Sequence, residues 1–245
     1  MKNSYQKELF IGLSHRGNSK KFIENSYEAF NSVIQMGFKY IETDLRMTLD
    51  REVIAFHDPN LKRLFNLDLQ VKDLTFNELS NLFREKNCSL LTLEDTLKKF
   101  PEIHFNIDLK VKEVIEESIK VVADLDGFDR VCFASFYSSH TEKVLKQNKN
   151  AIVSMGMKDV ALFKFFKFHN KKIKIIQIPL KWKGIKVMTK NLIQKANKSN
   201  LLVHAWTIND KKTINYLIDI GVNGIVTDEP ELLMKIMKER NLVFN

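Results

Sequence analysis

The stretch "LFIGLSHRGNSKKFIENSYEAF", residues 9–30, contains a strand, a loop and the start of a helix in direct succession. Its apolar run at 9–15 is typical of a buried β-strand, and a helix-like spacing of apolar residues follows about ten residues later. The strand ends on His15, Arg16 and Gly17. Two ionisable side chains and a glycine at a strand tip predict a functional site, if other strands bring polar groups to the same place.

The same pattern continues along the chain, where further apolar runs alternate with amphipathic stretches. The predicted strands are 9–15, 39–46, 103–110, 131–136, 151–156, 174–180, 201–207 and 223–228. Strands that alternate with helices predict a parallel sheet, and eight such units over about 220 residues predict a closed α/β barrel, the (β/α)8 TIM barrel.

Helices are predicted between the strands. They include 113–125, 189–197 after a cap at Thr189, 209–219 after a cap at Asn209, and a last helix that begins at Pro230. Asn25, with Glu28 three residues later, has the spacing of a capping pair and is predicted to open the first helix.

One interval between predicted strands is unusually long. Residues 47–102 separate the second and third strands and contain two short helical patterns, at 76–85 and 92–99. We interpret this segment as an elaborated loop on the rim of one domain, residues 1–245, because its shortness and its interruptions predict that it buries no core of its own.

Charge and composition limit the classes of binding partner that the sequence predicts. The formal net charge is +9, but the lysines occur along the whole length without an Arg/Lys block or a zinc or RNP motif, which argues against a nucleic-acid partner. No run approaches the roughly 18 apolar residues of a membrane span, so no stable membrane insertion is expected. The start "MKNSYQKELFIG" lacks the apolar core of a signal peptide and predicts a cytoplasmic location. Nothing in the sequence indicates the oligomeric state.

The segment "ALFKFFKFHNKK", residues 161–172, has two interpretations. Helical spacing places Leu162, Phe165, Phe166 and His169 on one side. We interpret it as an outer barrel helix whose phenylalanines pack on the sheet. The alternative is a basic amphipathic helix that rests on anionic lipid.

Acidic side chains lie at the ends of two predicted strands. Glu42 and Asp44 share one face of their strand, and Asp108 and Lys110 share one face of the next, because strand side chains alternate with period two. Three converging carboxylates without a cysteine cluster suit a hard divalent cation, Mg²⁺ or Ca²⁺. The alternative is that they only neutralise Arg16 and Lys110.

Two histidines lie at the same rim. His15 ends the first strand, and His57 lies in "AFHDP" after the second. Two imidazoles can act as general acid and general base near neutral pH. Arg16 and Lys110 add cations suited to phosphate oxygens. Together with a carboxylate-held metal ion, this set predicts phosphodiester chemistry.

In these residues the sequence resembles a known family, the glycerophosphodiester phosphodiesterases. The motifs that carry the resemblance span residues 10 to 235, in the order "HRGN", "ENSYEAF", "GFKYIETDLRMTLDREVIAFHDPNLKR", "LLTLEDTL", "NIDLK", "FASF", "IIQIP", "HAWTIND" and "GVNGIVTDEPELL". The resemblance implies a TIM barrel and a divalent cation. It also implies hydrolysis of a small-molecule glycerophosphodiester to glycerol 3-phosphate and an alcohol.

The resemblance also implies residue roles. His15 and His57 match the catalytic histidines, Glu42 and Asp44 match metal ligands, Arg16 and Lys110 match phosphate contacts, and Trp206 matches the aromatic residue beside the substrate. Asp108, predicted above as a third metal ligand, stands where the family usually has Glu, and its shorter side chain is compatible with direct or water-mediated binding. Glu24 matches a family glutamate, but it could equally complement a helix dipole.

Two other functions use similar features. Sphingomyelinase-D-like phospholipases share the barrel and the histidine pair, but they are typically secreted and disulfide-bonded, and Cys88 and Cys132 form no convincing pair. A non-catalytic barrel that binds phosphodiesters would have no need for both His15 and His57.

Overall fold

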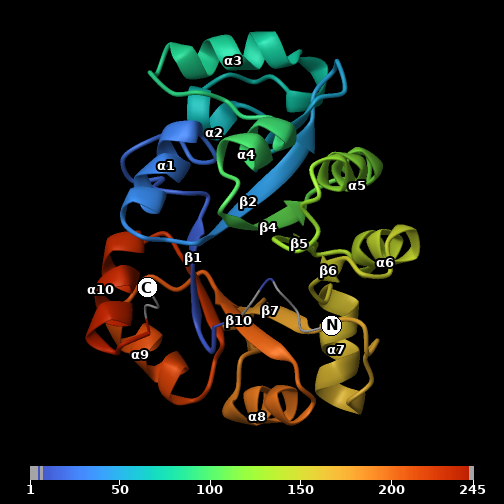
Figure 1. Ribbon diagram of the computed structural model, residues 1–245, viewed down its shortest axis with the longest axis vertical. Coiled ribbons are helices and arrows are strands. Elements are labelled where there is room, and N and C mark those ends of the chain that lie inside the picture. Colours follow the sequence, from blue (N-terminus) through green and yellow to red (C-terminus); the bar gives the residue numbers. More distant parts are fainter. Residues whose placement is uncertain (1–4, 6–7, 243–245) are drawn as a thin grey trace.

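Eight parallel strands form the wall of a nearly closed barrel in the computed structural model, which describes residues 5 and 8–242 (Figure 1). The strands are β1 (Ile11–His15), β2 (Tyr40–Met47), β4 (His104–Leu109), β5 (Val131–Ala134), β6 (Ile152–Val153), β7 (Ile175–Pro179), β10 (Leu202–Trp206) and β11 (Gly224–Thr227). A bridge between Ser154 and Ile175 joins the two ends of the sheet. All eight predicted strands and the TIM-barrel fold are confirmed, and the outermost residues of the predicted 1–245 domain lie outside the described residues.

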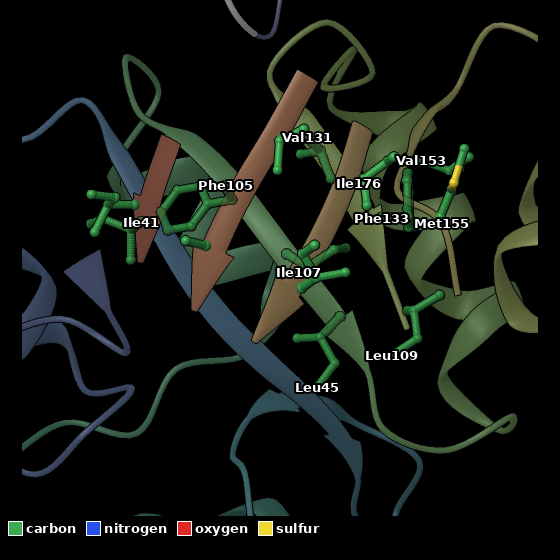
Figure 2. Packing of buried hydrophobic residues seen from close by; sticks show 14 of the residues in the cluster. Ile41, Leu45, Phe105, Ile107, Leu109, Val131, Phe133, Val153, Met155 and Ile176 are labelled. Atoms are coloured by element: carbon green, nitrogen blue, oxygen red, sulfur yellow. The ribbon is translucent and has the colours of Figure 1, made fainter. Parts of the chain in front are cut away.

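Two layers of apolar packing follow from the alternation of strand side chains. Figure 2 shows part of the larger cluster, to which Ile41, Leu45 and Phe105 belong together with residues of the surrounding helices. The inward-facing side chains change in polarity along β2. Tyr40, at the start of β2, lies in a separate apolar cluster made mostly of strand residues, whereas Glu42 further along β2 lines the cavity of the barrel. The barrel is therefore filled by apolar side chains at one end and lined by polar ones at the other.

Eight helices cover the described part of the barrel. They are α1 (Tyr27–Gln35), α4 (Leu93–Lys99), α5 (Val114–Asp124), α6 (Ser138–Gln147), α7 (Met157–Phe166), α8 (Lys190–Lys198), α9 (Lys211–Asp219) and α10 (Pro230–Glu239). Thr189 caps α8 as predicted. The other two predicted caps are each wrong by one residue, because Ser26 caps α1 and Asp210 caps α9.

The segment between β2 and β4 is more compact than predicted. It contains β3 (Val53–Ala55), α2 (Lys62–Phe65), the 3-10 helix η1 (Val71–Asp73), α3 (Phe76–Arg84) and α4 (Leu93–Lys99). Strand β3 pairs antiparallel with β2, and α2 and α3 lie together at one end of the molecule (Figure 1). The prediction that this segment buries no core is wrong. Eight residues form a separate buried cluster: Ile54, Phe56, Leu61, Val71, Leu79, Phe83, Cys88 and Leu90.

Helix α7 buries a different face from the one predicted. Phe163 is fully buried together with Val160 one turn earlier, whereas Phe165 and Phe166 are 72% and 75% exposed. His169 lies beyond the helix, because the backbone turns left-handed at Lys167. The prediction that Phe165 and Phe166 pack on the sheet is therefore wrong. Within residues 8–242, no helix is long and apolar enough to cross a membrane.

Candidate active site

A tight turn places the first site residues where β1 ends. Arg16 and Gly17 both have a positive φ, 59° and 77°. The Arg16 N–H donates to the Glu42 carbonyl at 2.9 Å, and the Arg16 carbonyl accepts from the Asn25 N–H at 2.9 Å. A Cβ at position 17 would lie 2.6 Å from the backbone carbon of Ala29. Only glycine fits this turn, which packs directly on the backbone of α1.

His15 is held between two carboxylates. Its Nδ1 lies 2.6 Å from Asp228 Oδ1, and its Nε2 lies 3.7 Å from Glu42 Oε2. Burial disfavours the charged imidazole, but the charge of Glu42 and the hydrogen bond to Asp228 outweigh it and raise the pKa of His15. Asn209 in turn donates to the second oxygen of Asp228 at 2.8 Å. Sequence reasoning did not single out Asp228, although its position directly after β11 was the signal that could have identified it.

His57 has its own carboxylate partner. Its Nδ1 lies 2.7 Å from Asp58 Oδ1, and Arg63 Nε donates to the other oxygen of Asp58 at 2.6 Å. Burial lowers the pKa of His57, and the nearby positive charges of Arg16 and Lys110 lower it further. Asp44 and Asp58 raise the pKa, but the net shift is downward. The two imidazoles are therefore each oriented through Nδ1, and their pKa values are shifted in opposite directions.

Two of the three predicted metal ligands are paired with cations. Asp44 lies 2.9 Å from Arg16 Nε and 2.9 Å from Lys110 Nζ. Burial raises the pKa of Asp44, but the charges of Lys110 and Arg16 outweigh it and lower the pKa to about 2. Lys110 also donates to Asp108 Oδ2 at 2.6 Å. Asn25, predicted as a helix cap, donates instead to Asp44 at 3.2 Å.

Glu42 differs from both aspartates. Its Oε2 is buried and has no hydrogen-bond partner among the described residues. Burial, and then the charge of Asp44, raise the pKa of Glu42 to about 8. A buried carboxylate oxygen without a partner costs free energy unless a proton or a cation compensates it.

The oxygen donors around Glu42 fit a hard cation, although they are not preassembled. Carboxylate oxygens are the ligands that Mg²⁺ and Ca²⁺ prefer, and Glu42 supplies a buried oxygen that has no hydrogen-bond partner among the described residues. In the described part of the chain, no three His, Cys, Asp or Glu side chains are grouped so that they could hold a metal ion. The predicted set of Glu42, Asp44 and Asp108 stays a prediction.

A chain of ion pairs connects the two histidine sites. Arg63 donates to both oxygens of Glu24, at 2.8 and 2.6 Å, and Arg16 Nη1 donates to Glu24 Oε1 at 3.0 Å. Glu24 precedes α1 and is buried, so it acts in this network rather than as an exposed helix-dipole group. No sequence signal identified Arg63, because it comes from the short helix α2 in the β2–β4 segment.

All of the predicted site residues line one cavity of about 690 Å³. They are His15, Arg16, Glu42, Asp44, His57, Asp108, Lys110 and Trp206. The opposite wall of the cavity is apolar and was not predicted. It includes Phe136, Met155, Val160, Ile178, Trp182, Ile185 and Val187.

Comparisons with known proteins identify the family of the chain. The model of the Glycerophosphoryl diester phosphodiesterase family matches residues 15–232. A Mycobacterium tuberculosis protein named "Probable glycerophosphodiester phosphodiesterase 2" is 27% identical over 241 residues, which cover 94% of this chain and 91% of that protein.

Solved structures support the same fold. The glycerophosphodiester phosphodiesterase of Thermotoga maritima has a TM-score of 0.76 at 24% identity, and the match covers 93% of this chain and 98% of that one. An Oleispira antarctica phosphodiesterase, solved in complex with the product sn-glycerol-3-phosphate, has a TM-score of 0.77 at 17% identity over 93% and 96% of the two chains. Because the family match extends over nearly the whole described barrel, the chain belongs to the glycerophosphoryl diester phosphodiesterase family and is a phosphoric diester hydrolase.

Proposed function

We propose that the protein hydrolyses small glycerophosphodiesters to glycerol 3-phosphate and an alcohol, with a divalent cation and with His15 and His57 as the groups that transfer protons. One observation carries the proposal. Two imidazoles, each held through Nδ1 by its own carboxylate, line the same cavity as Arg16 and Lys110. The product bound in the Oleispira antarctica neighbour supports the same substrate class.

The opposite pKa shifts of the two histidines support their assignment. His57, with its lowered pKa, is neutral near pH 7 and takes the proton of the attacking water. His15, with its raised pKa, is more readily protonated and gives a proton to the leaving alkoxide as the phosphorus–oxygen bond to the alcohol breaks. Asp58 and Asp228 act as positioning residues, since each sets the orientation of one imidazole.

The cations of the cavity complement the charge of the phosphodiester. Arg16 and Lys110 are both partly buried beside Asp44, so their positions are held before any substrate arrives. Their donors can stabilise negative charge on the non-bridging phosphoryl oxygens as it increases in the transition state. Trp206, at the end of β10, lines the same cavity and can contact the glycerol or the alcohol group.

We propose Glu42, Asp44 and Asp108 as the residues that would hold Mg²⁺ or Ca²⁺. The buried Oε2 of Glu42, which accepts no hydrogen bond from the described residues, is the observation that supports a cation there. When bound, the cation would supply electrostatic stabilisation of phosphoryl oxygens. The predicted cytoplasmic location stays a prediction.

A coupled assay of glycerol 3-phosphate release from glycerophosphocholine tests the proposed reaction. We expect release that requires added divalent cation. A sphingomyelinase-D-like enzyme would leave glycerophosphocholine intact and would release choline from a choline phospholipid. A non-catalytic barrel would bind glycerophosphocholine without turnover. A panel of glycerophosphodiesters with other alcohol groups would then define the preferred headgroup.

A further inference from the structure

The net positive charge of the protein is concentrated in one part of the chain. Residues 160–209 contain eleven lysines and no acidic residue, a net charge of +11. The other 195 residues contain 28 basic and 30 acidic residues, a net charge of −2. Lysines do occur along the whole chain, but only here are they not balanced by Asp or Glu.

The same segment exposes large apolar side chains. At the end of α7, Phe165, Phe166 and Phe168 are 72%, 75% and 67% exposed. On the hairpin formed by β8 (Lys181–Trp182) and β9 (Ile185–Lys186), Ile185 is 66% exposed. We call these four side chains and the exposed lysines among them, Lys167, Lys171, Lys172, Lys183 and Lys186, the phenylalanine–lysine patch.

The two parts of the patch lie next to each other at the mouth of the cavity. Lys164 Nζ on α7 donates to the carbonyl of Lys186 on the hairpin at 3.3 Å. Phe165 and Ile185 are both exposed and both line the cavity that contains the histidines. The patch is therefore continuous with the apolar wall of the active site.

We propose that the phenylalanine–lysine patch is a docking surface for an anionic lipid bilayer, which seats the mouth of the cavity on the membrane surface. Exposed aromatic rings of this kind bury themselves at the boundary between headgroups and acyl chains, while neighbouring lysines contact anionic headgroups. Clustered exposed apolar side chains on a soluble domain indicate an interaction site.

The charge of the patch selects its occupant. A second copy of the chain would bring the same lysines face to face, with no acidic residue between 160 and 209 to pair with them. An anionic bilayer supplies negative charge over a wide surface and an apolar layer directly beneath it, so it matches both components of the patch. This docking does not depend on the hydrolytic mechanism proposed above.

Vesicle co-sedimentation of the full chain tests the proposal. Phosphatidylcholine vesicles with about one third phosphatidylserine are compared with pure phosphatidylcholine vesicles, at low salt and at about 0.5 M salt, where the Debye length is well under 8 Å. We expect binding to the anionic vesicles that weakens at high salt but persists. In the F166S/F168S variant the salt-resistant binding should be weaker by roughly tenfold or more, because the two rings supply the apolar contribution to binding. The K167Q/K171Q/K172Q variant should lose mainly the low-salt component.

Matched controls separate docking from folding and from catalysis. The L49S/Y216S variant removes two exposed apolar side chains elsewhere on the surface, 59% and 50% exposed, and should bind vesicles like the original protein. Phe166 and Phe168 do not line the cavity, so F166S/F168S should hydrolyse glycerophosphocholine in solution like the original protein. If glycerophosphocholine is no substrate at all, the vesicle data still decide the docking proposal.

Three outcomes would overturn the proposal. The first is anionic-vesicle binding that disappears at high salt, which reduces the effect to net charge. The second is equal salt-resistant binding by F166S/F168S and the original protein. The third is binding of a macromolecule to the phenylalanine–lysine patch. It would be seen as self-association without lipid, or as binding to polyglutamate in preference to vesicles, and in either case F166S/F168S would abolish it.

Discussion

The two halves of the active-site cavity are built in different ways. Side chains of β1, β2 and β4 and of the segments that follow them form the charged half. Nearly every ionisable group there contacts one of opposite charge, as in the series His57, Asp58, Arg63, Glu24 and Arg16. Residues that follow β5 and β6, together with residues of β7, α7 and the β8–β9 hairpin, form the apolar half. The charged half depends on specific partners at specific distances, whereas the apolar half depends on packing and shape. Substitutions should therefore affect chemistry in the first half and stability or surface binding in the second.

The largest effect is expected from removing the divalent cation. Exhaustive chelation should reduce glycerol 3-phosphate release to background, because the cation that would stabilise the charge on the phosphoryl oxygens is then absent. Without a cation the raised pKa of Glu42, about 8, favours its protonated form near neutral pH. Adding Mg²⁺ or Ca²⁺ back should restore the activity. Full activity in the chelated protein would show that the carboxylates of the charged half serve only as ion-pair partners.

The histidine variants come next in size. H15A and H57A should each lower kcat by roughly 10²- to 10⁴-fold, the usual scale for loss of a general acid or base. The double variant should lose less than the product of the two, because groups that act in one step are not additive. H169A, in a histidine that does not line the cavity, is the matched control and should keep its kcat. Near-normal kcat in H15A or H57A would make that histidine structural.

A smaller effect is expected when the orientation of His15 is weakened. D228N should lower kcat by roughly 10- to 100-fold, the scale seen when a carboxylate that orients a histidine is lost. Asp228 raises the pKa of His15, so its removal lowers that pKa. Because the protonated form of His15 is proposed to act, the limb of the pH–rate profile on which activity falls with rising pH should move to lower pH. A drop in kcat with an unmoved profile would indicate only a general structural defect.

The apolar half allows a matched pair of stability measurements on one helix. F163A should lower the free energy of unfolding by about 3–5 kcal/mol, as truncation of a buried phenylalanine does. F166A, three residues later and 75% exposed, should change it by no more than about 0.5 kcal/mol. Urea unfolding followed by circular dichroism measures both. Equal losses in the two variants would mean that Phe166 packs in the core in solution, and the docking surface would then not exist.

Much of the charged half could be predicted from the sequence. Strands of alternating apolar character, each ending on a polar residue, identify His15, Glu42, Asp44 and Asp108 as neighbours, because the carboxyl ends of parallel strands meet at one rim. The structure confirms this proximity, with Asp44 directly opposite Asp108 in the register of β2 and β4.

The missed residues share one property, which is that their partners are distant in the sequence. Asp228 pairs with a histidine 213 residues away, and Arg63 pairs with a glutamate 39 residues away. The capping pattern at Asn25 also gave a wrong prediction, because the Asn25 side chain donates a hydrogen bond to Asp44 and does not cap the helix. Local spacing contains no information about such partners.

The sequence by itself determined the eight strands, the barrel and the positions of the histidines and carboxylates, because periodicity and strand ends are local properties of the chain. Only the tertiary structure decided which face of α7 is buried, that the β2–β4 segment closes around its own core, and that a lysine-rich surface with exposed phenylalanines borders the active site. The physical reason is that apolar residues such as Phe163 and Phe166 have the same chemistry, and only the position of the surrounding elements determines which of them is covered.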